Sequence, residues 1–370
     1  MLLGFDAKRA FQNSTGLGNY SRDVLRILAR YHPEHRYLAY GPRLVPGRLA
    51  EGVEARGPDG LLGRLLPSLW RVSGLAAQAA RDGVALFHGL SNELPLGIER
   101  TGVRSVVSIH DLIFERFPEL YRPIDRRIYR WKFRNSAERA GLVLAVSEQT
   151  KRDLVDLYRV DPARIRVVYQ GCHPVFQAAP DPVADEAAAR RLGLPERYLL
   201  NVGTVERRKN LLLLVKALPD LAGLPLLVAG RETAYAAVVR AEAERLGVAG
   251  RVRFLGTSLP LADLAVLYRR CAAFAYPSIF EGFGIPIIEA HFCGAPVVTS
   301  AGGVFPEAGG PGACYVDPAD AGALAAALQG ILADPDRRAA MRTAGRAYVE
   351  RFTDRAVAAA LMAVYQEALA

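Results

Sequence analysis

Hydrophobic positions along the chain alternate between short apolar runs and longer segments in which apolar residues recur every three or four positions. Short apolar runs predict buried strands, and the longer pattern predicts amphipathic helices. Their alternation indicates consecutive strand–helix–strand units, which build parallel sheets with helices on both faces. We therefore expect an α/β protein made of two doubly wound, Rossmann-like domains.

The expected elements fall into two series. In the first series, strands are expected at Leu2–Phe5, Arg36–Tyr40, Val84–His88, Ser105–Ile109, Leu142–Val146 and Ile165–Tyr169, with helices at 19–30, 68–82, 122–140 and 148–158. In the second series, strands are expected at Tyr198–Val202, Leu226–Ala229, Val252–Leu255, Ala273–Tyr276, Pro296–Thr299 and Cys314–Val316, and helices at 319–333, 336–351 and 354–369 close the chain.

A change of composition separates the two series. Residues 175–195 combine several prolines with alanines and acidic residues, a pattern typical of a linker. This predicts an N-terminal domain at 1–174 and a C-terminal domain at 196–351. We expect the helix within 352–370 to return to the N-terminal domain.

Length and composition agree with this division. The chain has 370 residues, 51% of them hydrophobic, which is enough for two α/β cores. No apolar run is long enough to predict a transmembrane helix, and the N-terminus shows no secretion signal. The four cysteines are scattered without metal-ligand spacing, so we expect reduced thiols in a cytoplasmic protein.

The positive charge lies entirely in the first half. Residues 1–174 hold 27 Lys and Arg against 18 Asp and Glu, whereas residues 175–370 hold 20 of each kind. Within the first half, Arg122–Arg139 interleaves basic and aromatic residues. An anionic partner is one interpretation: an acidic lipid surface, a lipid-phosphate acceptor or nucleic acid. An ordinary solvated surface, in a chain whose basic residues are nearly all arginine, is the other.

Two glutamates bracket a glycine-rich helix start in the second half. In the segment from Glu281 to Glu289, E-G-F-G-I-P-I-I-E, the glycines allow close approach of a ligand and Pro286 suits the first turn of a helix. A helix N-terminus there would direct N–H groups at a diphosphate. Glu289, one turn into the helix, can accept ribose hydroxyls, and Glu281 can accept sugar hydroxyls. The alternative is a strand–loop–helix corner with two surface glutamates.

A basic loop follows the first strand of the second half. It runs Gly203-Thr204-Val205-Glu206-Arg207-Arg208-Lys209-Asn210. Basic groups clustered at a strand end suit a diphosphate leaving group, whose growing negative charge Arg208 and Lys209 would neutralise. A solvated basic loop that caps a helix is the alternative.

A glycine loop follows the first strand of the chain and contains Gly16 and Gly18. It fails as a dinucleotide-binding fingerprint, because position 21 is Ser and no Asp or Glu occurs from 35 through 50. A tight strand–helix turn is the alternative interpretation of this loop.

His110, with Asp111, ends a strand of the first half, and His88 ends another. A histidine facing a cleft can bind sugar hydroxyls or orient an acceptor, although a lone histidine is more often structural.

The segment Glu281–Glu289 resembles the Glu-x7-Glu signature of the retaining GT-B glycosyltransferases of family 4, group 1. The loop at 203–210 resembles the family's G-T-x-E-P-R-K-N variant, with Thr204 where many relatives have Arg and Arg207 where Pro is common. The resemblance implies a GT-B fold, with an N-terminal acceptor-binding domain and a C-terminal nucleotide-sugar-binding domain facing across a cleft.

The resemblance also implies residue roles. Glu281 and His110 would contact the donor sugar, Glu289 the ribose, and Lys209 and Arg208 the phosphates. Further donor-binding residues would be Gly16, Gly18, Gly203, Gly256, Thr257, Phe283, Gly284 and Ile285. The resemblance implies no cofactor, because the nucleotide sugar is itself a substrate, and no metal ion, because enzymes of this fold class usually work without a bound metal. We expect no nucleic-acid partner.

The paired motifs resemble mannosyltransferases that use GDP-mannose, with a UDP-hexose enzyme as the alternative. The acceptor would be a glycan or a lipid-linked glycan in polysaccharide or cell-envelope synthesis. We expect a cytoplasmic protein, with peripheral contact between the basic domain and the inner face of an anionic membrane left open. A nucleotide-sugar epimerase would need an acid–base set that the sequence does not show. A non-enzymatic basic binding protein would leave Glu281, Glu289 and Lys209 unexplained.

Overall fold

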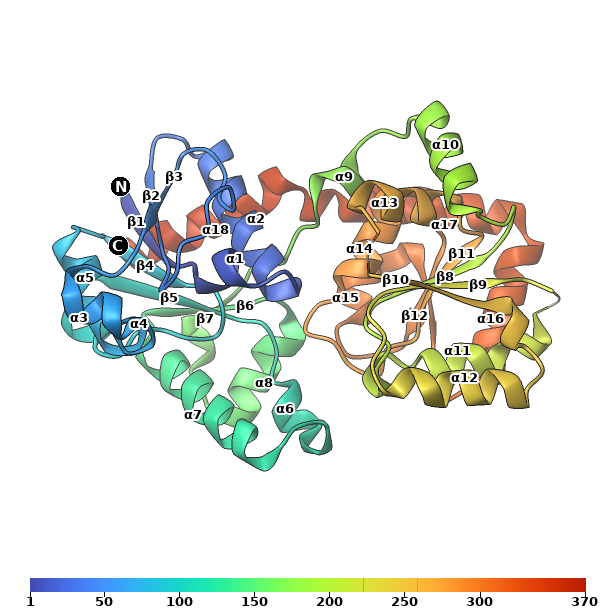
Figure 1. The fold of residues 1–370 in the computed structure, drawn as a ribbon, viewed down its shortest axis with the longest axis horizontal. Helices are drawn as coiled ribbons and strands as arrows, with labels where there is room; N and C mark the ends of the chain where they lie inside the picture. The colour runs from blue at the N-terminus through green and yellow to red at the C-terminus, as the bar shows by residue number, and fades with distance from the viewer. Residues whose placement is uncertain (222, 258) are drawn as a thin grey trace. The chain divides into compact units, whose positions relative to one another are not determined.

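Parallel strands form the centre of each half of the chain, in a computed structural model that describes residues 1–221, 223–257 and 259–370. The chain divides into unit 1, which comprises Met1–Gln170 and Asp354–Ala370, and unit 2, which comprises Gly171–Thr353 (Figure 1). The two parallel α/β sheets confirm the fold class expected from the alternating pattern.

The sheet of unit 1 has the strand order β3-β2-β1-β4-β5-β6-β7, with every pairing parallel. Its strands are β1 (Leu2–Asp6), β2 (Arg36–Tyr40), β3 (Val53–Arg56), β4 (Leu86–Gly89), β5 (Arg104–Ile109), β6 (Leu142–Ala145) and β7 (Ile165–Val167). The sequence pattern missed β3, because this edge strand is largely exposed and has no apolar run.

Helices cover both faces of this sheet. Helices α2 (Gly16–Tyr31) and α18 (Asp354–Leu369) pack on one face, while α5 (Leu75–Arg81), α7 (Pro123–Arg139) and α8 (Glu148–Tyr158) contribute to the core on the other. Shorter helices are α1 (Lys8–Gln12), α3 (Gly60–Leu65), α4 (Pro67–Leu69), η1 (Trp70–Gly74) and α6 (Ile113–Arg116). The last helix of the chain therefore completes the core of unit 1, where Tyr365 and Leu361 are buried.

The sheet of unit 2 has the order β10-β9-β8-β11-β12-β13, also parallel. Its strands are β8 (Leu199–Val202), β9 (Leu226–Ala229), β10 (Val252–Gly256), β11 (Ala273–Tyr276), β12 (Val297–Ser300) and β13 (Ala313–Val316). Its principal helices are α11 (Leu211–Ala217), α12 (Tyr235–Arg245), α13 (Leu261–Arg270), α14 (Ile285–Phe292), α16 (Ala321–Ala333) and α17 (Pro335–Tyr348). Adjacent strands β8 and β11 lie at the middle of the sheet and carry the two strongest sequence motifs.

The segment expected as a linker contains two helices, α9 (Pro174–Gln177) and α10 (Pro182–Leu192). Asp181 caps α10 by accepting the N–H groups of residues 183 and 184, and Pro182 occupies the first turn. Asp185 then pairs with Arg269 of α13 at 2.5 Å. The prolines here begin helices rather than interrupt them, so this segment is packed structure within unit 2.

None of the helices in the described part of the chain is long and apolar enough to cross a membrane.

Candidate functional site

The best-defined cluster of charged side chains lies where β8 and β11 end. Because neighbouring parallel strands present their carboxyl ends at the same edge of a sheet, the loops that follow β8 and β11 meet there. The loop after β8 brings Arg208 and Lys209, and the loop after β11 brings Glu281. The structure thus brings together three of the residues singled out in the sequence.

Glu281 is the centre of this cluster and is buried. Its Oε1 lies 2.6 Å from Lys209 Nζ, and its Oε2 lies 2.8 Å from an Arg208 guanidinium nitrogen. The Tyr276 hydroxyl, at the end of β11, accepts a hydrogen bond from Lys209 Nζ at 2.7 Å and donates one to Glu281 Oε1 at 3.0 Å. Two cations, one buried carboxylate and one phenol therefore form a connected group, which the part-exposed Glu206 carboxylate joins at Arg208, at 2.7 Å.

Electrostatics fixes the charge state of this group. Burial alone would raise the pKa of Glu281, but Lys209 and Arg208 outweigh it and lower that pKa to about 2. For Lys209, burial acts to lower the pKa, and the charge of Glu281 overcomes it, so the net direction is upward. All three groups are therefore ionised at neutral pH, which keeps two cations ready for an anionic ligand in a site of low dielectric constant.

Backbone hydrogen bonds lock the two loops together. Arg208 donates to the carbonyl of Phe280 at 2.6 Å, and the N–H of Ile279 donates to the carbonyl of Arg208 at 2.9 Å. Asn210 adopts a left-handed backbone conformation, with a φ of 57°, and its side-chain amide donates to the carbonyls of Pro277 and Pro318. The cations are thus held by a rigid turn rather than by a solvated loop, which was the alternative interpretation of this motif.

The loop between the two glutamates leads into α14 as the glycine–proline pattern predicts. Gly284 precedes the helix with a φ of +112°, a conformation that favours glycine, and a Cβ there would meet Ala308 at 3.3 Å. The Phe283 ring is buried and packs edge-on against Phe352, so a role in ligand binding would belong to its backbone. Ile285 begins the helix.

Glu289 lies in α14, one turn after the start of the helix. Its carboxylate accepts a hydrogen bond of 2.9 Å from the buried Tyr268 hydroxyl of α13. This bond orients the glutamate side chain, which is half-buried.

The remaining donor-site predictions in unit 2 fall at strand ends. Gly203 follows β8, while Gly256 ends β10 and Thr257 comes next, with its side chain exposed. Gly230, which the sequence analysis did not select, follows β9 between them. A Cβ on Gly230 would lie 1.9 Å from the Gly203 carbonyl oxygen, so only glycine allows these two loops to approach.

In unit 1, His110 directly follows β5, and it is buried with both ring nitrogens in hydrogen bonds. Nε2 lies 2.9 Å from the Leu90 carbonyl, and Nδ1 lies 3.1 Å from the Gln170 side-chain amide nitrogen. Because a carbonyl only accepts, Nε2 carries the proton and Nδ1 accepts from Gln170. Burial lowers the pKa of His110 to about 4, so the ring is neutral, and a sugar hydroxyl would have to replace one of these partners.

His88 lies in β4, one residue before its end, and belongs to a buried chain of polar side chains rather than to an open surface. Its ring nitrogens share hydrogen bonds with Tyr365 at 2.7 Å and Ser108 at 2.8 Å, and Ser108 is bonded in turn to Tyr20 at 2.8 Å. The Tyr20 ring lies edge-on to His110, with centroids 4.5 Å apart. His88 is thus a satisfied core histidine that supports the surroundings of His110. Asp111 is nearby in sequence and caps the turn at Ile113.

The two glycines at the start of α2 differ in their surroundings. The Gly18 N–H donates to the Thr15 carbonyl, and a Cβ on Gly18 would lie 1.9 Å from the Asn13 carbonyl oxygen. A Cβ on Gly16 would meet nothing within 4 Å. The tight turn therefore accounts for Gly18, whereas no packing requirement accounts for Gly16.

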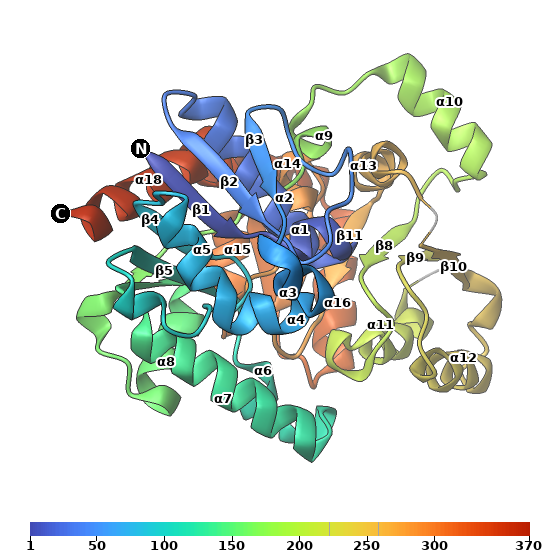
Figure 2. The ribbon, with the colours of Figure 1, turned by 60° about the vertical axis from the view of Figure 1, so that its left-hand side comes forward.

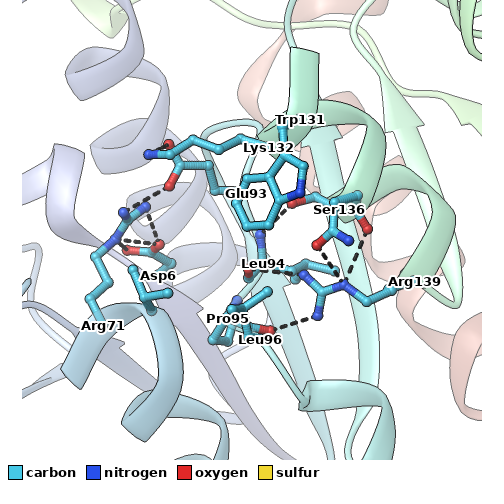
Figure 3. A pocket seen from close by; sticks show the side chains of 12 residues that line it. Asp6, Arg71, Glu93, Leu94, Pro95, Leu96, Trp131, Lys132, Ser136 and Arg139 are labelled. Carbon is cyan, nitrogen blue, oxygen red and sulfur yellow. Dashed lines mark hydrogen bonds and ion pairs between the residues drawn. The ribbon is translucent and has the colours of Figure 1, made fainter. Parts of the chain in front are cut away.

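A groove in unit 1 holds a second group of charges that the sequence analysis missed (Figure 3). Arg71 lines this groove, and its guanidinium group forms ion pairs with the carboxylates of Asp6, at 2.6 Å, and Glu93, at 2.9 Å. The Lys132 ammonium group pairs with the same Glu93 carboxylate at 3.2 Å. Trp131 and Leu96 add apolar walls. Nothing in the local pattern marks Arg71, since its partners lie 65 and 22 positions away.

Other residues also escaped the sequence analysis. Tyr276 was expected only as part of an apolar strand, and Tyr268 was not singled out. The signal available in the sequence was a tyrosine among buried positions, whose hydroxyl must find a partner. Within residues 1–221, 223–257 and 259–370, no cluster of three or more His, Cys, Asp or Glu side chains is arranged to hold a metal ion.

Comparison with known families matches both halves of the chain. Residues 185–348 match the family described as Glycosyl transferases group 1, and residues 14–175 match Glycosyltransferase Family 4. The O-antigen chain mannosyltransferase B of Escherichia coli is 33% identical over 362 residues, which cover 92% of this chain and 92% of that protein. The D-inositol 3-phosphate glycosyltransferase of Thermobispora bispora is 36% identical over 248 residues, covering 62% of this chain and 56% of that protein.

Solved structures show the same fold. HepE of Anabaena, in complex with UDP and glucose, aligns with a TM-score of 0.75 and 20% identity over 99% of this chain and 100% of its own. Sucrose-phosphate synthase of Thermosynechococcus elongatus aligns with a TM-score of 0.77 and 24% identity over 99% of this chain and 98% of its own.

Proposed function

Since this chain belongs to the glycosyl transferases of group 1, family 4, and is a hexosyltransferase of glycan synthesis, we propose that it transfers mannose from GDP-mannose with retention of anomeric configuration. The acceptor in this proposal is a glycan or a lipid-linked glycan of a polysaccharide or the cell envelope. The mannosyltransferase of Escherichia coli, which matches over nearly the whole chain, supports mannose as the sugar. We also propose a cytoplasmic location.

The observation that carries the proposal is the buried group of Lys209, Arg208 and Glu281. When the bond between the sugar and the diphosphate breaks, negative charge grows on the leaving phosphate. Lys209 and Arg208 are preorganised to neutralise that charge, so they stabilise the transition state more than the ground state. We propose that these two cations neutralise the leaving phosphate without the help of a metal ion.

Glu281 has two tasks in this proposal. Through its ion pairs it holds the two cations in place and offsets part of their repulsion. With the donor bound, the phosphates take over part of the cationic charge, and the carboxylate becomes available to accept hydroxyls of the transferred sugar. Glu289 would accept the ribose hydroxyls while Tyr268 holds it in orientation.

The other site residues keep their proposed roles. Backbone groups of Phe283, Gly284, Ile285 and Gly203 would contact phosphate and sugar, and Gly256 with Thr257 would lie near the base. From unit 1 we assign His110 to the sugar, and Gly16 and Gly18 to phosphate. No carboxylate is assigned as a nucleophile: the leaving phosphate takes the acceptor's proton as the acceptor attacks on the same face, so the protein acts by positioning and charge stabilisation.

A UDP-hexose donor is the second candidate. Its support is the HepE structure, which contains UDP and glucose and shares the fold of this chain.

The test is a thermal-shift and calorimetric panel of GDP, UDP, ADP and their sugar conjugates. Ligands that bind the folded state raise the melting temperature. We expect GDP and GDP-mannose to stabilise the wild type and to lose this effect in Glu289→Ala, while Glu244→Ala, an exposed glutamate in α12, behaves as wild type. If only UDP compounds stabilise the protein, the donor is a UDP sugar and the assignment of GDP-mannose is wrong. If no nucleotide stabilises it, the assigned donor site is wrong.

Retention is tested separately on the product. Proton NMR of the glycoside formed should show the anomeric configuration of the donor, and an inverted product would contradict the same-face mechanism.

A further inference from the structure

Exposed apolar side chains gather on one part of unit 1. Among the described residues, fifteen large apolar side chains are exposed in unit 1 and four in unit 2. Eight of the fifteen form what we call the apolar patch: Leu61, Leu65, Leu66, Leu69 and Val72 on α3 to η1, and Ile124, Ile128 and Trp131 on α7.

The α7 part of the patch points away from the protein core. Ile124, Ile128 and Trp131 are spaced by four and three positions, so they form one stripe along the helix. The side of α7 that faces the core instead carries the buried Ser136 and Ala137. An ordinary surface helix is polar on its outer face, and α7 is apolar there.

The two parts of the patch meet at one groove. Val72 of η1 and Trp131 of α7 both line this groove, and Figure 3 shows Arg71 of η1 and Trp131 of α7 on facing sides of it, while Figure 2 shows α3, α4 and α7 within unit 1. The groove therefore joins the α3 to η1 part of the patch to the α7 part, and a gathering of exposed apolar residues of this kind marks an interaction surface.

Arginines surround the patch. Arg64 on α3 and Arg127, Arg130 and Arg134 on α7 are exposed. Arg130 and Arg134 pair with Glu115 and Glu138. In the part of the chain that the structure describes, Arg64 and Arg127 have no ion-pair partner. Unit 1 as a whole holds 28 Lys and Arg against 20 Asp and Glu, whereas unit 2 holds 19 against 18.

We propose that the apolar patch docks unit 1 onto a lipid bilayer that carries anionic headgroups. Helices that lie in a membrane interface combine an apolar face with Arg or Lys at its border, and the patch has both features. Trp131 suits the interface because its ring is apolar while its N–H can reach water. Membrane docking would bring a lipid-linked acceptor to the enzyme, and this biological role rests on the proposed function. The docking itself does not depend on that function.

Trp131 gives a direct optical test with the full chain. The chain has two tryptophans, of which Trp70 is 5% exposed and Trp131 is 56% exposed. Mixing the protein with vesicles of phosphatidylcholine and phosphatidylglycerol should shift the Trp131 emission to the blue and carry the protein into the vesicle pellet. The Trp131→Phe variant should still enter the pellet and lose the shift, because it keeps an apolar ring.

Substitutions separate the apolar and charged contributions. Ile128→Ser and Leu65→Ser should each weaken binding about tenfold, because each removes a side chain that enters the interface. Arg127→Gln should weaken it about fivefold, and added salt should have a similar effect. The matched control is Val238→Ser in unit 2, at a residue that is 49% exposed, against 44% for Ile128. Melting curves establish that every variant is folded.

Equal binding of all these variants, or no binding to anionic vesicles, would overturn the proposal. Equal binding to vesicles of pure phosphatidylcholine would show that the patch does not require anionic headgroups, against the proposal. Self-association of the protein without lipid, if the patch variants abolish it, would assign the patch to contact with a second copy of the chain. The vesicle assay uses neither donor nor acceptor. Its failure therefore leaves the nucleotide-binding test untouched, and the reverse also holds.

Discussion

The substitution Glu281→Gln probes the central charged group of unit 2. Glutamine has nearly the same shape as glutamate but removes the charge, so Lys209 and Arg208 remain buried without their shared anion. We expect this variant to be less stable than the wild type at neutral pH, and we expect the difference to depend on pH.

The magnitude follows from the pKa of Glu281. The group titrates at about 2 in the folded protein against an ordinary value of 4.5. A difference of this size corresponds to about 3 kcal/mol of stability, at 1.36 kcal/mol per pKa unit. Because the folded pKa is the lower one, this stability is fully present above pH 4.5 and is lost as the pH falls towards 2. The gap between wild type and variant should therefore be about 3 kcal/mol at pH 7 and close as the pH falls.

Urea unfolding of both proteins, followed at several pH values from 7 to below 4, measures this gap. Glu206→Gln is the control, because Glu206 also pairs with Arg208, at 2.7 Å, but its side chain is 38% exposed against 10% for Glu281. An exposed pair contributes about 1 kcal/mol or less. A gap that does not change with pH, or equal losses in Glu281→Gln and Glu206→Gln, would refute this account of the group.

Two further predictions concern unit 1. Gly18→Ala should lower the stability measured by thermal unfolding by about 2 kcal/mol, because the added Cβ would lie 1.9 Å from the Asn13 carbonyl oxygen. The control, Gly16→Ala, should change stability by less than about 0.5 kcal/mol, because its Cβ would meet nothing within 4 Å. Equal effects of the two substitutions would contradict the packing argument. Burial lowers the pKa of His88 to about 3 in the folded protein, against an ordinary value of 6.5. Below pH 6.5 the unfolded chain therefore binds a proton at His88 that the folded protein does not bind. The stability of the folded protein consequently falls as the pH becomes more acidic. His88→Gln should reduce the slope of unfolding free energy against pH between 6.5 and 5 by about one proton, and an unchanged slope would show that His88 is not the group responsible.

Most of the fold was predictable because its elements have local patterns. Strands β1 and β11 were expected from apolar runs within one residue of their bounds, and α8 was expected at 148–158, the bounds it has in the structure, where the Ser147 side chain caps it by accepting the Thr150 N–H. The pattern failed at β3, which is exposed, and at α10, where prolines were interpreted as a linker.

The sequence by itself determined the class of fold, the strand ends where chemistry should be sought, and the residue types found there. Lys209, Arg208 and Glu281 could be selected from two motifs, because each motif is a continuous stretch of chain. The pairing between those motifs was decided only by the tertiary structure, which places β8 beside β11 and brings residues 72 positions apart into contact. The same holds for Arg71 between Asp6 and Glu93, and for Tyr268 on Glu289. Periodicity and turn chemistry act over a few residues, whereas strand order and buried ion pairs depend on the packing of the whole domain, which no local pattern encodes.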